Sequence, residues 1–170
     1  DDAIGGLCLG MPHTSQRVPT CSPNSAYAKH IVVEVARQLE EVDPDFSFTT
    51  LYVSHNCRSR MHADSSNSGA SFQLSIVPHC GGFLLEFAPR AAPTAWEANA
   101  WSRTDGTVPH MGLPFCGDRV AVIAYTHDIS IRDDSDKQRS AAYSLGFPLP
   151  SNQQRQYIAA EYARSTRPSF

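Results

Sequence analysis

Short runs rich in β-branched and aromatic residues, separated by clusters of Gly, Pro, Asn and Asp, occupy the middle of the chain. The four clearest runs are residues 46–53, 71–77, 83–87 and 120–125. Residues of these types favour strands, and the clusters between them favour chain reversals, as at Gly81-Gly82 and Gly117-Asp118. Several short strands of this kind predict a mainly β fold, either a sandwich or a barrel.

Helical patterns flank the β-rich region. Between residues 25 and 42 apolar side chains recur at steps of three and four residues, until an Asp-Pro pair stops the pattern. This predicts a helix that packs one apolar stripe on a sheet. Acidic residues at its start and Gly146 at its end predict a second helix over residues 133–145, and a third helix is predicted over residues 151–164.

The chain of 170 residues has no internal repeat, and its length suits one ordinary domain. Residues 1–24 mix Gly, Pro, Ser and Thr without a period, which predicts an irregular N-terminal lead-in. Residues 25–150 form the predicted β domain with its N-terminal helix, and residues 151–170 form a helical tail. Since the first residue is Asp, we expect a piece of a longer protein from which targeting signals could be missing.

Charge, hydropathy and cysteine content indicate which partners and which compartment the protein has. The formal charge of −3, with 14 Lys and Arg spread thinly, gives no basic run that would follow phosphates, so a nucleic-acid partner is not favoured. No apolar stretch approaches the roughly 18 residues of a membrane span, so we expect no membrane partner. The five cysteines are odd in number and form no CxxC pair, which favours a reducing compartment and an intracellular protein of the cytoplasm or nucleus.

One subset of the histidines and acids has a spacing that suits a metal ion. His62 and Asp64 stand two residues apart, so on an extended backbone their side chains point to the same face. His110, 46 residues after Asp64, could supply a third ligand from across a barrel. Two imidazoles and one carboxylate leave coordination positions open and select non-haem Fe(II). The alternative is a chance His-x-Asp pair on a polar loop.

Arg119 stands at the entry to the apolar run 120–124. A guanidinium buried at the start of an apolar strand needs an anionic partner, and the carboxylate of a small cosubstrate would bind it through two hydrogen bonds. The alternative is a salt bridge to Asp118, Asp105 or another acid.

Four motifs follow one another in an order that is more informative than spacing alone. They are MHADSSNSGAS over residues 61–71, GGFL over 81–84, DGTVPHMGLPFCGDRV over 105–120 and GFPLP over 146–150. This order resembles the 2-oxoglutarate/Fe(II)-dependent dioxygenase superfamily. It is similar to short members common in unicellular algae, and distantly similar to thymine- and methylcytosine-oxidising enzymes and prolyl hydroxylases. The resemblance covers residues 46–150.

The resemblance implies a double-stranded β-helix, the cupin-like jelly roll, for the domain at residues 25–150. It also implies that His62, Asp64 and His110 bind Fe(II), and that Arg119 holds the far carboxylate of the cosubstrate 2-oxoglutarate. The implied activity is that of a dioxygenase that uses 2-oxoglutarate and O₂ to hydroxylate a C–H bond of its substrate, with succinate and CO₂ as products.

One position departs from the family pattern. Many of these relatives have Asn on the strand that ends at residue 53, where this chain has Ser54, so a polar contact to the cosubstrate is lost or remade. Asn67 and Ser71 are candidates for that contact, and so is Asn56. The competing role for all three is to cap the turn after the metal loop.

Other side chains have alternative roles at this stage. Asp105 or Thr107 could fix the tautomer of His110. Two His/Cys pairs suggest a zinc site but lack structural-zinc spacing: His55 with Cys57, and His79 with Cys80. Four aromatic side chains are expected in the barrel core rather than on a base-stacking surface: Tyr52, Phe72, Phe115 and Tyr125.

The substrate is selected by loops rather than by the metal ligands, and residues 55–61 and 88–104 are the segments that could cover the mouth of the site. The lack of a basic stripe favours a protein side chain or a small molecule over a nucleobase. Two alternatives come from other classes of protein. One is a non-catalytic double-stranded β-helix that binds or scaffolds, and the other is a zinc-dependent cupin-like isomerase with the same ligands but no carboxylate on Arg119.

Overall fold

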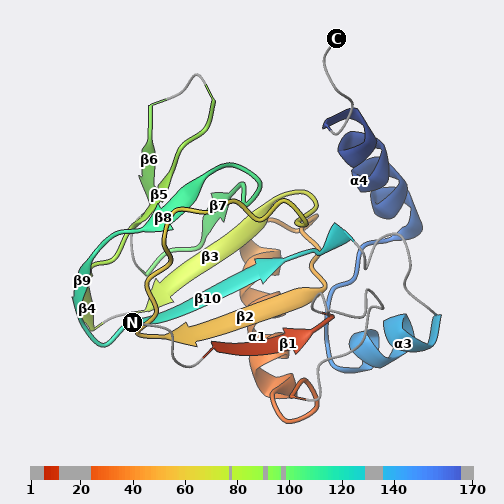
Figure 1. Cartoon of the computed structure of the whole chain (residues 1–170). Helices are drawn as coiled ribbons and strands as arrows, with labels where there is room; N and C mark the ends of the chain where they lie inside the picture. The colour runs from red at the N-terminus through yellow and green to blue at the C-terminus, as the bar shows by residue number, and fades with distance from the viewer. Residues whose placement is uncertain are drawn as a thin grey trace.

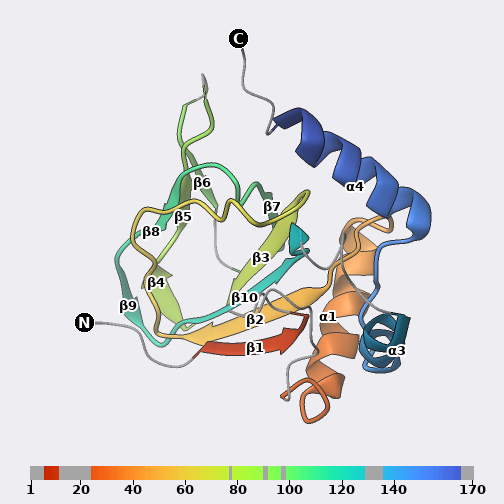
Figure 2. The ribbon, with the colours of Figure 1, turned by 45° about the vertical axis from the view of Figure 1, so that its right-hand side comes forward.

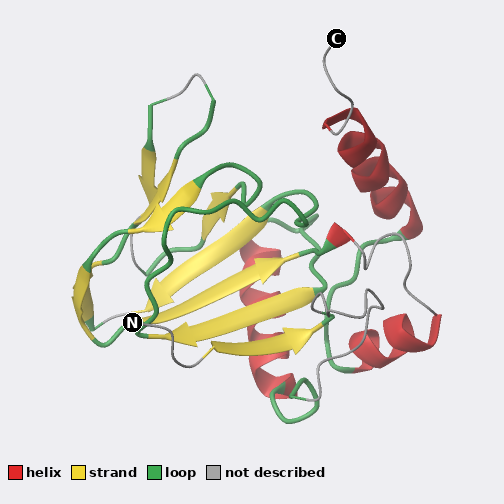
Figure 3. Cartoon of the chain, viewed as in Figure 1, coloured by secondary structure: helices red, strands yellow, loops and turns green. Residues whose placement is uncertain are grey.

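The computed structural model describes residues 6–11, 24–76, 78–89, 92–96, 99–128 and 136–165, and short antiparallel strands dominate them (Figure 1, Figure 3). In chain order the elements are β1 (Gly6–Gly10), α1 (Lys29–Val42), β2 (Thr50–His55), β3 (Ser71–Ile76), β4 (His79–Gly81), β5 (Leu84–Glu86), β6 (Thr94–Trp96), β7 (Ser102–Thr104), β8 (His110–Gly112), β9 (Phe115–Gly117), β10 (Val120–Tyr125), α3 (Asp136–Ser144) and α4 (Asn152–Ser165). The prediction of a mainly β fold with flanking helices is confirmed.

The strands form three antiparallel sheets. The largest has the order β1-β2-β10-β3-β7, the second has the order β6-β5-β8, and the third is the pair β4-β9. Figures 1 and 2 show the two smaller sheets together on one side of the large sheet, with α1 on its other side. Within the described residues no hydrogen-bonded ladder joins the three sheets into a closed barrel.

Side chains of the large sheet alternate between its two faces, as the pleat of a strand requires. On β10, Val122 and Ala124 face the core, whereas Ile123 and Tyr125 line a cavity. The neighbouring strands follow the same rule: the core face carries Leu7, Leu9, Leu51, Val53, Phe72 and Leu74, and the cavity face carries Cys8, Tyr52, Ser71 and Gln73. One face of the sheet therefore builds the core and the other face builds a site.

Helix α1 covers the core face of the large sheet. Its buried side chains are Val32, Val35 and Leu39. The helix begins at Lys29 rather than at residue 25, because residues 24–28 form turns and the N-cap residue Ala28 has no side chain that can cap. It ends where predicted, and the backbone N–H of Asp43 donates to the carbonyl of Leu39 at 2.8 Å.

Strand β1 corrects the prediction of an irregular lead-in over residues 1–24. It pairs with β2 from Gly6 opposite Ser54 to Gly10 opposite Thr50. Glycines at both ends hid this strand, because Gly has low strand propensity. The buried side chain of Leu9 and the hydrogen bonds to β2 stabilise it instead. Residues 1–5 and 12–23 lie outside the described residues.

The other predicted strands are present with shifted ends. β10 coincides with the predicted run, and β3 follows its run up to Ile76, beyond which Val77 lies outside the described residues. β2 starts at Thr50 rather than at residue 46, because Phe46 and Phe48 stack in the core with ring centroids 5.8 Å apart. β4, β6, β8 and β9 have three residues each, too few to show a period in the sequence.

The helices α3 and α4 confirm the two predicted C-terminal helices. In the ranges that the structure describes, no helix combines the length and apolar character needed to cross a membrane.

A disulfide joins Cys80 on β4 to Cys116 on β9. The cysteine pattern did not predict it, because the two residues are 36 positions apart and meet only through the register of β4 and β9. Disulfides persist mainly in oxidising compartments. The bridge therefore counts against the expectation of a reducing compartment.

Candidate metal centre

Backbone hydrogen bonds bring His62 and His110 together. His62 lies in the segment between β2 and β3, His110 begins β8, and each donates its backbone N–H to the carbonyl of the other, at 3.0 and 2.8 Å. Asp64 donates its backbone N–H to the carbonyl of Gly106 at 2.8 Å. The ligand atoms of His62, Asp64 and His110 all lie within 4.8 Å of one another. The structure thus gathers the three residues that the sequence singled out as metal ligands.

Each imidazole is oriented by a carbonyl two residues before it. His62 Nδ1 lies 2.7 Å from the carbonyl oxygen of Arg60, and His110 Nδ1 lies 2.9 Å from that of Val108. Because a carbonyl only accepts hydrogen bonds, the proton of each neutral ring belongs on Nδ1. The lone pair of each Nε2 is then free to bind a metal ion.

The turn before β8 is closed by its own side chains. Asp105 Oδ1 accepts hydrogen bonds from the backbone N–H and the hydroxyl of Thr107, at 2.9 and 2.6 Å. The expectation that Asp105 or Thr107 fixes the tautomer of His110 is therefore wrong. These two side chains bind each other, and the carbonyl of Val108 accepts the hydrogen bond from His110 Nδ1.

The ligand atoms converge without bonding to one another. His62 Nε2 lies 3.7 Å from Asp64 Oδ1, and His110 Nε2 lies 3.9 Å from Asp64 Oδ2. Both separations exceed hydrogen-bond distance. His110 is buried, whereas the side chains of His62 and Asp64 are 42% and 46% exposed and open to a cavity. Two imidazole nitrogens and one carboxylate on one face form the donor set of non-haem Fe(II) sites.

In the part of the chain that the structure describes, no second group of three His, Cys, Asp or Glu side chains could hold a metal ion. This finding weighs against a zinc site at the His/Cys pairs. His55 Nε2 instead lies 3.3 Å from Asp118 Oδ1, and Cys80 forms a disulfide with Cys116.

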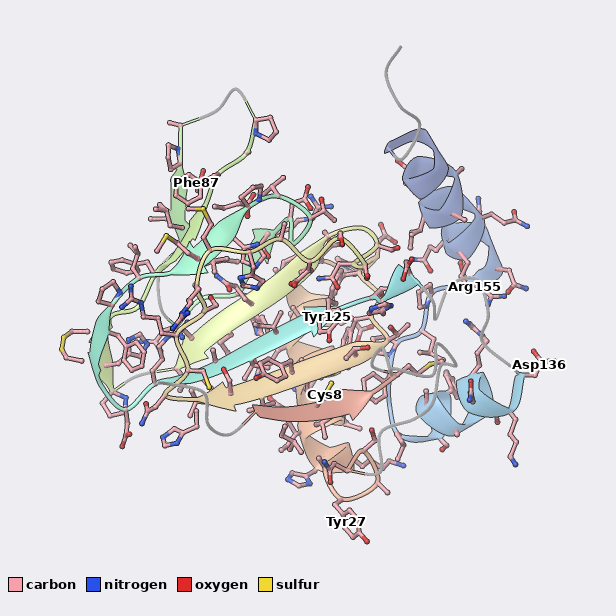
Figure 4. All side chains as sticks on the ribbon, in the orientation of Figure 1. Cys8, Tyr27, Phe87, Tyr125, Asp136 and Arg155 are labelled. Atoms are coloured by element: carbon pink, nitrogen blue, oxygen red, sulfur yellow. A yellow bond between two sulfur atoms is a disulfide. The ribbon has the colours of Figure 1, made fainter. Side chains whose placement is uncertain are left out.

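A cavity of about 790 Å³ opens on the three ligands. Its wall from the large sheet carries Tyr52, Tyr125 and Cys8, of which Figure 4 labels the last two. The expectation that Tyr52 and Tyr125 lie in the core is wrong, because they stand on the cavity face of β2 and β10. Of the four aromatic side chains predicted for the core, Phe72 lies there. No Lys or Arg is found among the described residues that line the cavity.

The cavity wall opposite the ligands is uncharged near neutral pH. Burial raises the pKa of the Cys8 thiol, which a hydrogen bond from Tyr125 opposes only in part. Burial also raises the pKa of the Tyr125 phenol. Both groups therefore keep their protons, since loss of a proton would place a charge in a poorly hydrated wall.

Asn67 and Ser71 line the cavity beside Asp64. Asn67 Nδ2 lies 3.5 Å from Asp64 Oδ2, and its backbone N–H donates to the Asp64 carbonyl at 2.9 Å. Ser71 Oγ is buried and has no hydrogen-bond partner among the described residues. An unpaired buried hydroxyl is uncommon in folded proteins. At the wall of a cavity, it offers a hydrogen bond to a bound molecule.

Asn56 takes a structural role. With a φ of 53°, it accepts a hydrogen bond from the backbone N–H of Arg119 on Oδ1 at 2.8 Å and donates from Nδ2 to Asp118 Oδ1 at 2.9 Å. Ser54, which replaces the Asn of many relatives, is buried on β2 opposite Ala121 and is not among the residues that line the cavity.

Arg119 is buried just before β10 and does not itself line the cavity. Its Nε donates to Ser75 Oγ at 2.9 Å, its Nη1 donates to the Cys57 carbonyl at 3.1 Å, and its guanidinium lies 5.6 Å from the ring centroid of Phe115. No acid among the described residues lies within 4.0 Å of it, which weighs against the salt-bridge alternative. Burial lowers its pKa, because the charge is poorly hydrated.

A polar stripe on β3 leads from the cavity to Arg119. Ser71, Gln73 and Ser75 share one face of the strand because they alternate with Phe72 and Leu74. Ser71 and Gln73 line the cavity, and Ser75 binds the Arg119 guanidinium. The metal ligands and the buried cation thus stand at two ends of one polar strip.

A buried pair that sequence reasoning missed also borders the cavity. His127 Nδ1 lies 3.0 Å from Asp128 Oδ1, and the two side chains are 7% and 10% exposed. His127 lines the cavity and forms a β-bridge with Asn67. The only trace in the sequence is a His-Asp pair two residues after the last β run, which has no recognised spacing.

The two segments expected to cover the mouth behave differently. Ser59, in segment 55–61, lines the cavity. In segment 88–104 only Thr104 does so among the described residues. Trp101 packs instead against the core and donates its indole N–H to Gln38 Oε1 on α1 at 3.0 Å. Trp101 therefore contributes to the core and not to a cover over the cavity.

Comparisons with known proteins were made at the level of sequence and of structure. No protein-family model matches the chain, and no curated protein matches its sequence significantly. Among solved structures, a 2OG-Fe(II) oxygenase family oxidoreductase from Burkholderia pseudomallei matches with a TM-score of 0.54 and 13% identity, over 71% of this chain and 66% of that one. NgTET1 in complex with 5mC DNA matches with a TM-score of 0.61 and 11% identity, over 82% of this chain and 68% of that one.

The chain shares the fold of these oxygenases. The oxygenase fold agrees with the jelly roll expected from the sequence, although the hydrogen-bonded sheets of the described residues stay separate. The chain spans just under two thirds of the Burkholderia oxygenase and 68% of NgTET1. The His62–Asp64–His110 cluster therefore lies in a fold that this chain shares with these oxygenases.

Proposed function

We propose that this chain is a 2-oxoglutarate- and Fe(II)-dependent dioxygenase built on an open double-stranded β-helix. The observation that carries the proposal is the His62–Asp64–His110 cluster, whose imidazoles are both held by carbonyls so that Nε2 can bind a metal ion. The likeness in fold to two oxygenases supports it.

The donor set fits Fe(II). Three protein ligands on one face leave about three octahedral positions for other ligands. A structural metal site would instead be closed by protein ligands, as structural zinc sites are. His62 and Asp64 are half-exposed to the cavity, so the side of the cluster that faces the cavity is open to further ligands.

The surroundings of Arg119 and Ser71 fit a dicarboxylate cosubstrate. Arg119 is a buried cation without an acid at ion-pair distance among the described residues, and such a cation is costly unless an anion pairs with it. Ser71 Oγ is a buried hydroxyl that lacks a partner in the same described part of the chain. We propose that Arg119 holds the far carboxylate of 2-oxoglutarate and that Ser71 and Asn67 contact its metal-binding end.

When bound, Fe(II) and 2-oxoglutarate supply the oxidising chemistry that inserts an oxygen atom of O₂ into a C–H bond. The residues of the chain orient and shield that chemistry. The carbonyls of Arg60 and Val108 keep the protons of the two imidazoles on Nδ1. Asn67 Nδ2 lies 3.5 Å from Asp64 Oδ2 and helps to orient the carboxylate. Cys8 and Tyr125 keep their protons, so the part of the cavity wall that they form carries no charge.

The cavity favours a neutral substrate. Its described lining has no Lys or Arg, and the polar residues Ser59, Ser65 and Ser66 contribute to it. A neutral small molecule or an uncharged protein side chain satisfies these groups without an unpaired buried charge.

A methylated nucleobase is the second candidate substrate. Tyr125 gives the cavity an aromatic ring, and Asn67 and His127 give it hydrogen-bonding groups, the combination that a base extruded from a duplex requires. NgTET1, which shares the fold, is described in complex with 5mC DNA. Because the chain has few basic residues to bind phosphates, we expect its contact with a nucleic acid to be limited to the target base and the adjacent nucleotides.

Thermal unfolding under anaerobic conditions with Mn(II), with and without 2-oxoglutarate, tests the proposal. A ligand at about 100 times its Kd stabilises the native state by about 2.7 kcal/mol, which for a chain of this size raises Tm by about 5–10 °C. We expect this increase in the wild type and in Arg37→Ala, which removes a surface arginine. We expect it to vanish in Arg119→Ala and to shrink in Arg119→Lys, which keeps the charge but loses the paired hydrogen bonds.

The alternatives predict different results. Stabilisation by the metal without any effect of 2-oxoglutarate in the wild type would favour a cupin-like isomerase. No stabilisation by Mn(II) or Fe(II) would favour a non-catalytic binding or scaffold domain. Either result would overturn the dioxygenase proposal.

A further inference from the structure

The pair β4–β9 is a small sheet of its own that carries the disulfide at its centre. His79 lies opposite Gly117, Cys80 opposite Cys116, and Gly81 opposite Phe115. Both cysteines are exposed, so a reductant in solution can reach the bond. The pair has three residues in each strand, and backbone hydrogen bonds from Asp118 to Pro78, from Gly82 to Pro114 and from Leu113 to Phe83 extend the pairing at both ends. Two-stranded pairs are marginally stable on their own, and the covalent bridge adds a cross-link at the centre of this one.

The residues next to the two cysteines surround the Arg119 side chain. His79 precedes Cys80, and its Nε2 lies 2.9 Å from Ser75 Oγ, the same oxygen that accepts from Arg119 Nε at 2.9 Å. Phe115 precedes Cys116, and its ring lies under the guanidinium at 5.6 Å. The rings of His79 and Phe115 meet edge to face, with centroids 6.4 Å apart.

The turn after β4 adds to this contact. A Cβ built on Gly82 would lie 3.0 Å from Arg119 Cδ and 3.0 Å from Phe115 Cβ, so the backbone of the turn packs directly on the arginine side chain. The β4–β9 pair and its turn thus touch the aliphatic stem, the Nε side and the flat face of Arg119.

The backbone of Arg119 is held from the other side. Its N–H donates to Asn56 Oδ1 at 2.8 Å, and its carbonyl accepts from the backbone N–H of Asn56 at 2.8 Å. These bonds do not involve β4 or β9. Loss of order in the β4–β9 pair would therefore remove the Phe115 ring from the guanidinium and His79 from the shared Ser75 hydroxyl, while the hydrogen bonds of the guanidinium to Ser75 and Cys57 and the backbone of Arg119 stayed in place.

We propose that the Cys80–Cys116 disulfide positions the Arg119 guanidinium through His79 and Phe115, and that the redox state of this cysteine pair sets the affinity for the dicarboxylate cosubstrate. The inference rests on the proposed function, in which Arg119 binds the far carboxylate of 2-oxoglutarate. His79 and Phe115 are positioning residues in this scheme. The oxidised protein is the form that binds 2-oxoglutarate, and the reduced protein is the weak-binding form.

The switching step is thiol–disulfide exchange with a dithiol reductant. A thiolate of the reductant attacks one sulfur, the Cys80–Cys116 bond breaks, and a mixed disulfide forms. The second thiol of the reductant then closes its own disulfide and releases Cys80 and Cys116 as thiols. Two electrons and two protons pass from the reductant to the protein, and the reductant leaves as a disulfide.

The experiment measures 2-oxoglutarate and Mn(II) binding by anaerobic calorimetry on the full chain. Three samples are compared: the oxidised wild type, the wild type reduced with a dithiol and desalted, and Cys80→Ser/Cys116→Ser. We expect 2-oxoglutarate to bind roughly tenfold more weakly to the last two, the loss expected for one hydrogen bond to a charged group. We expect Mn(II) affinity to be equal in all three, because its ligands lie outside β4 and β9. The double variant should not respond to the reductant.

Two further probes separate positioning from general loosening. A 2-oxo acid without the far carboxylate, 2-oxobutyrate, should bind equally in both redox states. Phe115→Leu and His79→Gln should weaken 2-oxoglutarate binding with the disulfide intact and leave Mn(II) binding unchanged. Equal 2-oxoglutarate affinity before and after a reduction confirmed by thiol counting would overturn this inference and leave the proposed function standing. Failure of 2-oxoglutarate to bind any sample that holds Mn(II) would instead overturn the proposed function.

Discussion

His62 and His110 exchange two backbone hydrogen bonds, at 3.0 and 2.8 Å, although they are 48 residues apart in the chain. The bridge involves no side-chain atom of either residue. The positions of the two imidazoles are therefore set by the backbone, and their directions are set by the carbonyls of Arg60 and Val108. The backbone bridge is therefore independent of the imidazole atoms that are proposed to bind the metal ion.

Replacement of His110 by Ala tests this independence. The backbone bridge to His62 survives the substitution, so the far-ultraviolet circular dichroism of the protein should not change. Mn(II) affinity should fall by more than about 100-fold, since loss of a residue that only supports a ligand already costs 10–100-fold. Titration of Mn(II) by electron paramagnetic resonance measures the loss. His30→Ala, on the exposed face of α1, is the matched control, and full Mn(II) affinity in His110→Ala would contradict the assignment.

Gly10 and Gly69 form a matched pair for the packing of β1. Both have positive φ, 93° and 76°, so Ala costs about 1–2 kcal/mol in backbone strain at either position. A Cβ at Gly10 would also meet the carbonyl oxygen of Thr49 and, at 2.6 Å, the ring of Phe147, whereas a Cβ at Gly69 meets nothing within 4 Å. Gly10→Ala should therefore lower the free energy of unfolding by about 1–3 kcal/mol more than Gly69→Ala. Urea unfolding measures the difference, and equal values would show that β1 is loosely packed.

Asn56→Ala should change both stability and the titration of Asp118. Its Nδ2 donates to Asp118 Oδ1, and this hydrogen bond, followed by the contributions of His55, lowers the pKa of that carboxyl. A lowered pKa stabilises the fold above the ordinary pKa, and the contribution is lost as the pH falls through the lowered value. In Asn56→Ala, the pKa of Asp118 should therefore rise part of the way toward the ordinary value of an aspartate.

The stability difference between Asn56→Ala and wild type should include about 1–3 kcal/mol from the unpaired backbone N–H of Arg119 at any pH. The part due to Asp118 should disappear in acid below the lowered pKa. Carbon-detected NMR of the carboxyl follows the titration. Asn99→Ala shares the positive φ, 61°, and should leave the pKa of Asp118 unchanged. An unchanged pKa in Asn56→Ala would refute the pairing.

The cluster of His62, Asp64 and His110 could be predicted in part because it depends on local geometry. A two-residue step on extended backbone places His62 and Asp64 on one side whatever the rest of the chain does. His110 was recognisable from the motif around it. The strand over residues 120–125 and the helix of residues 29–42 were also predictable, since each has a period long enough to recognise.

The features that were missed depend on partners far away in the chain. The strand at Gly6–Gly10 exists because β2 offers it hydrogen bonds, and its own composition argues against it. The disulfide depends on the register of two three-residue strands. The pairing of His127 with Asp128 at the cavity becomes visible only once the bridge to Asn67 is known. Each of these features depends on contacts with residues far away in the chain, so no short stretch of sequence predicts it.

The alternation along β10, β3 and β2 has a consequence for how such a protein can diverge. Side chains at Gln73, Ile123 and Tyr52 face the cavity, and their neighbours on each strand belong to the core. Mutations of the cavity-facing side chains can therefore alter which molecules the cavity binds. The core-facing side chains, which stabilise the fold, stay unchanged. A lineage of such chains can explore new substrates by single substitutions, one strand position at a time, while the same core continues to fold.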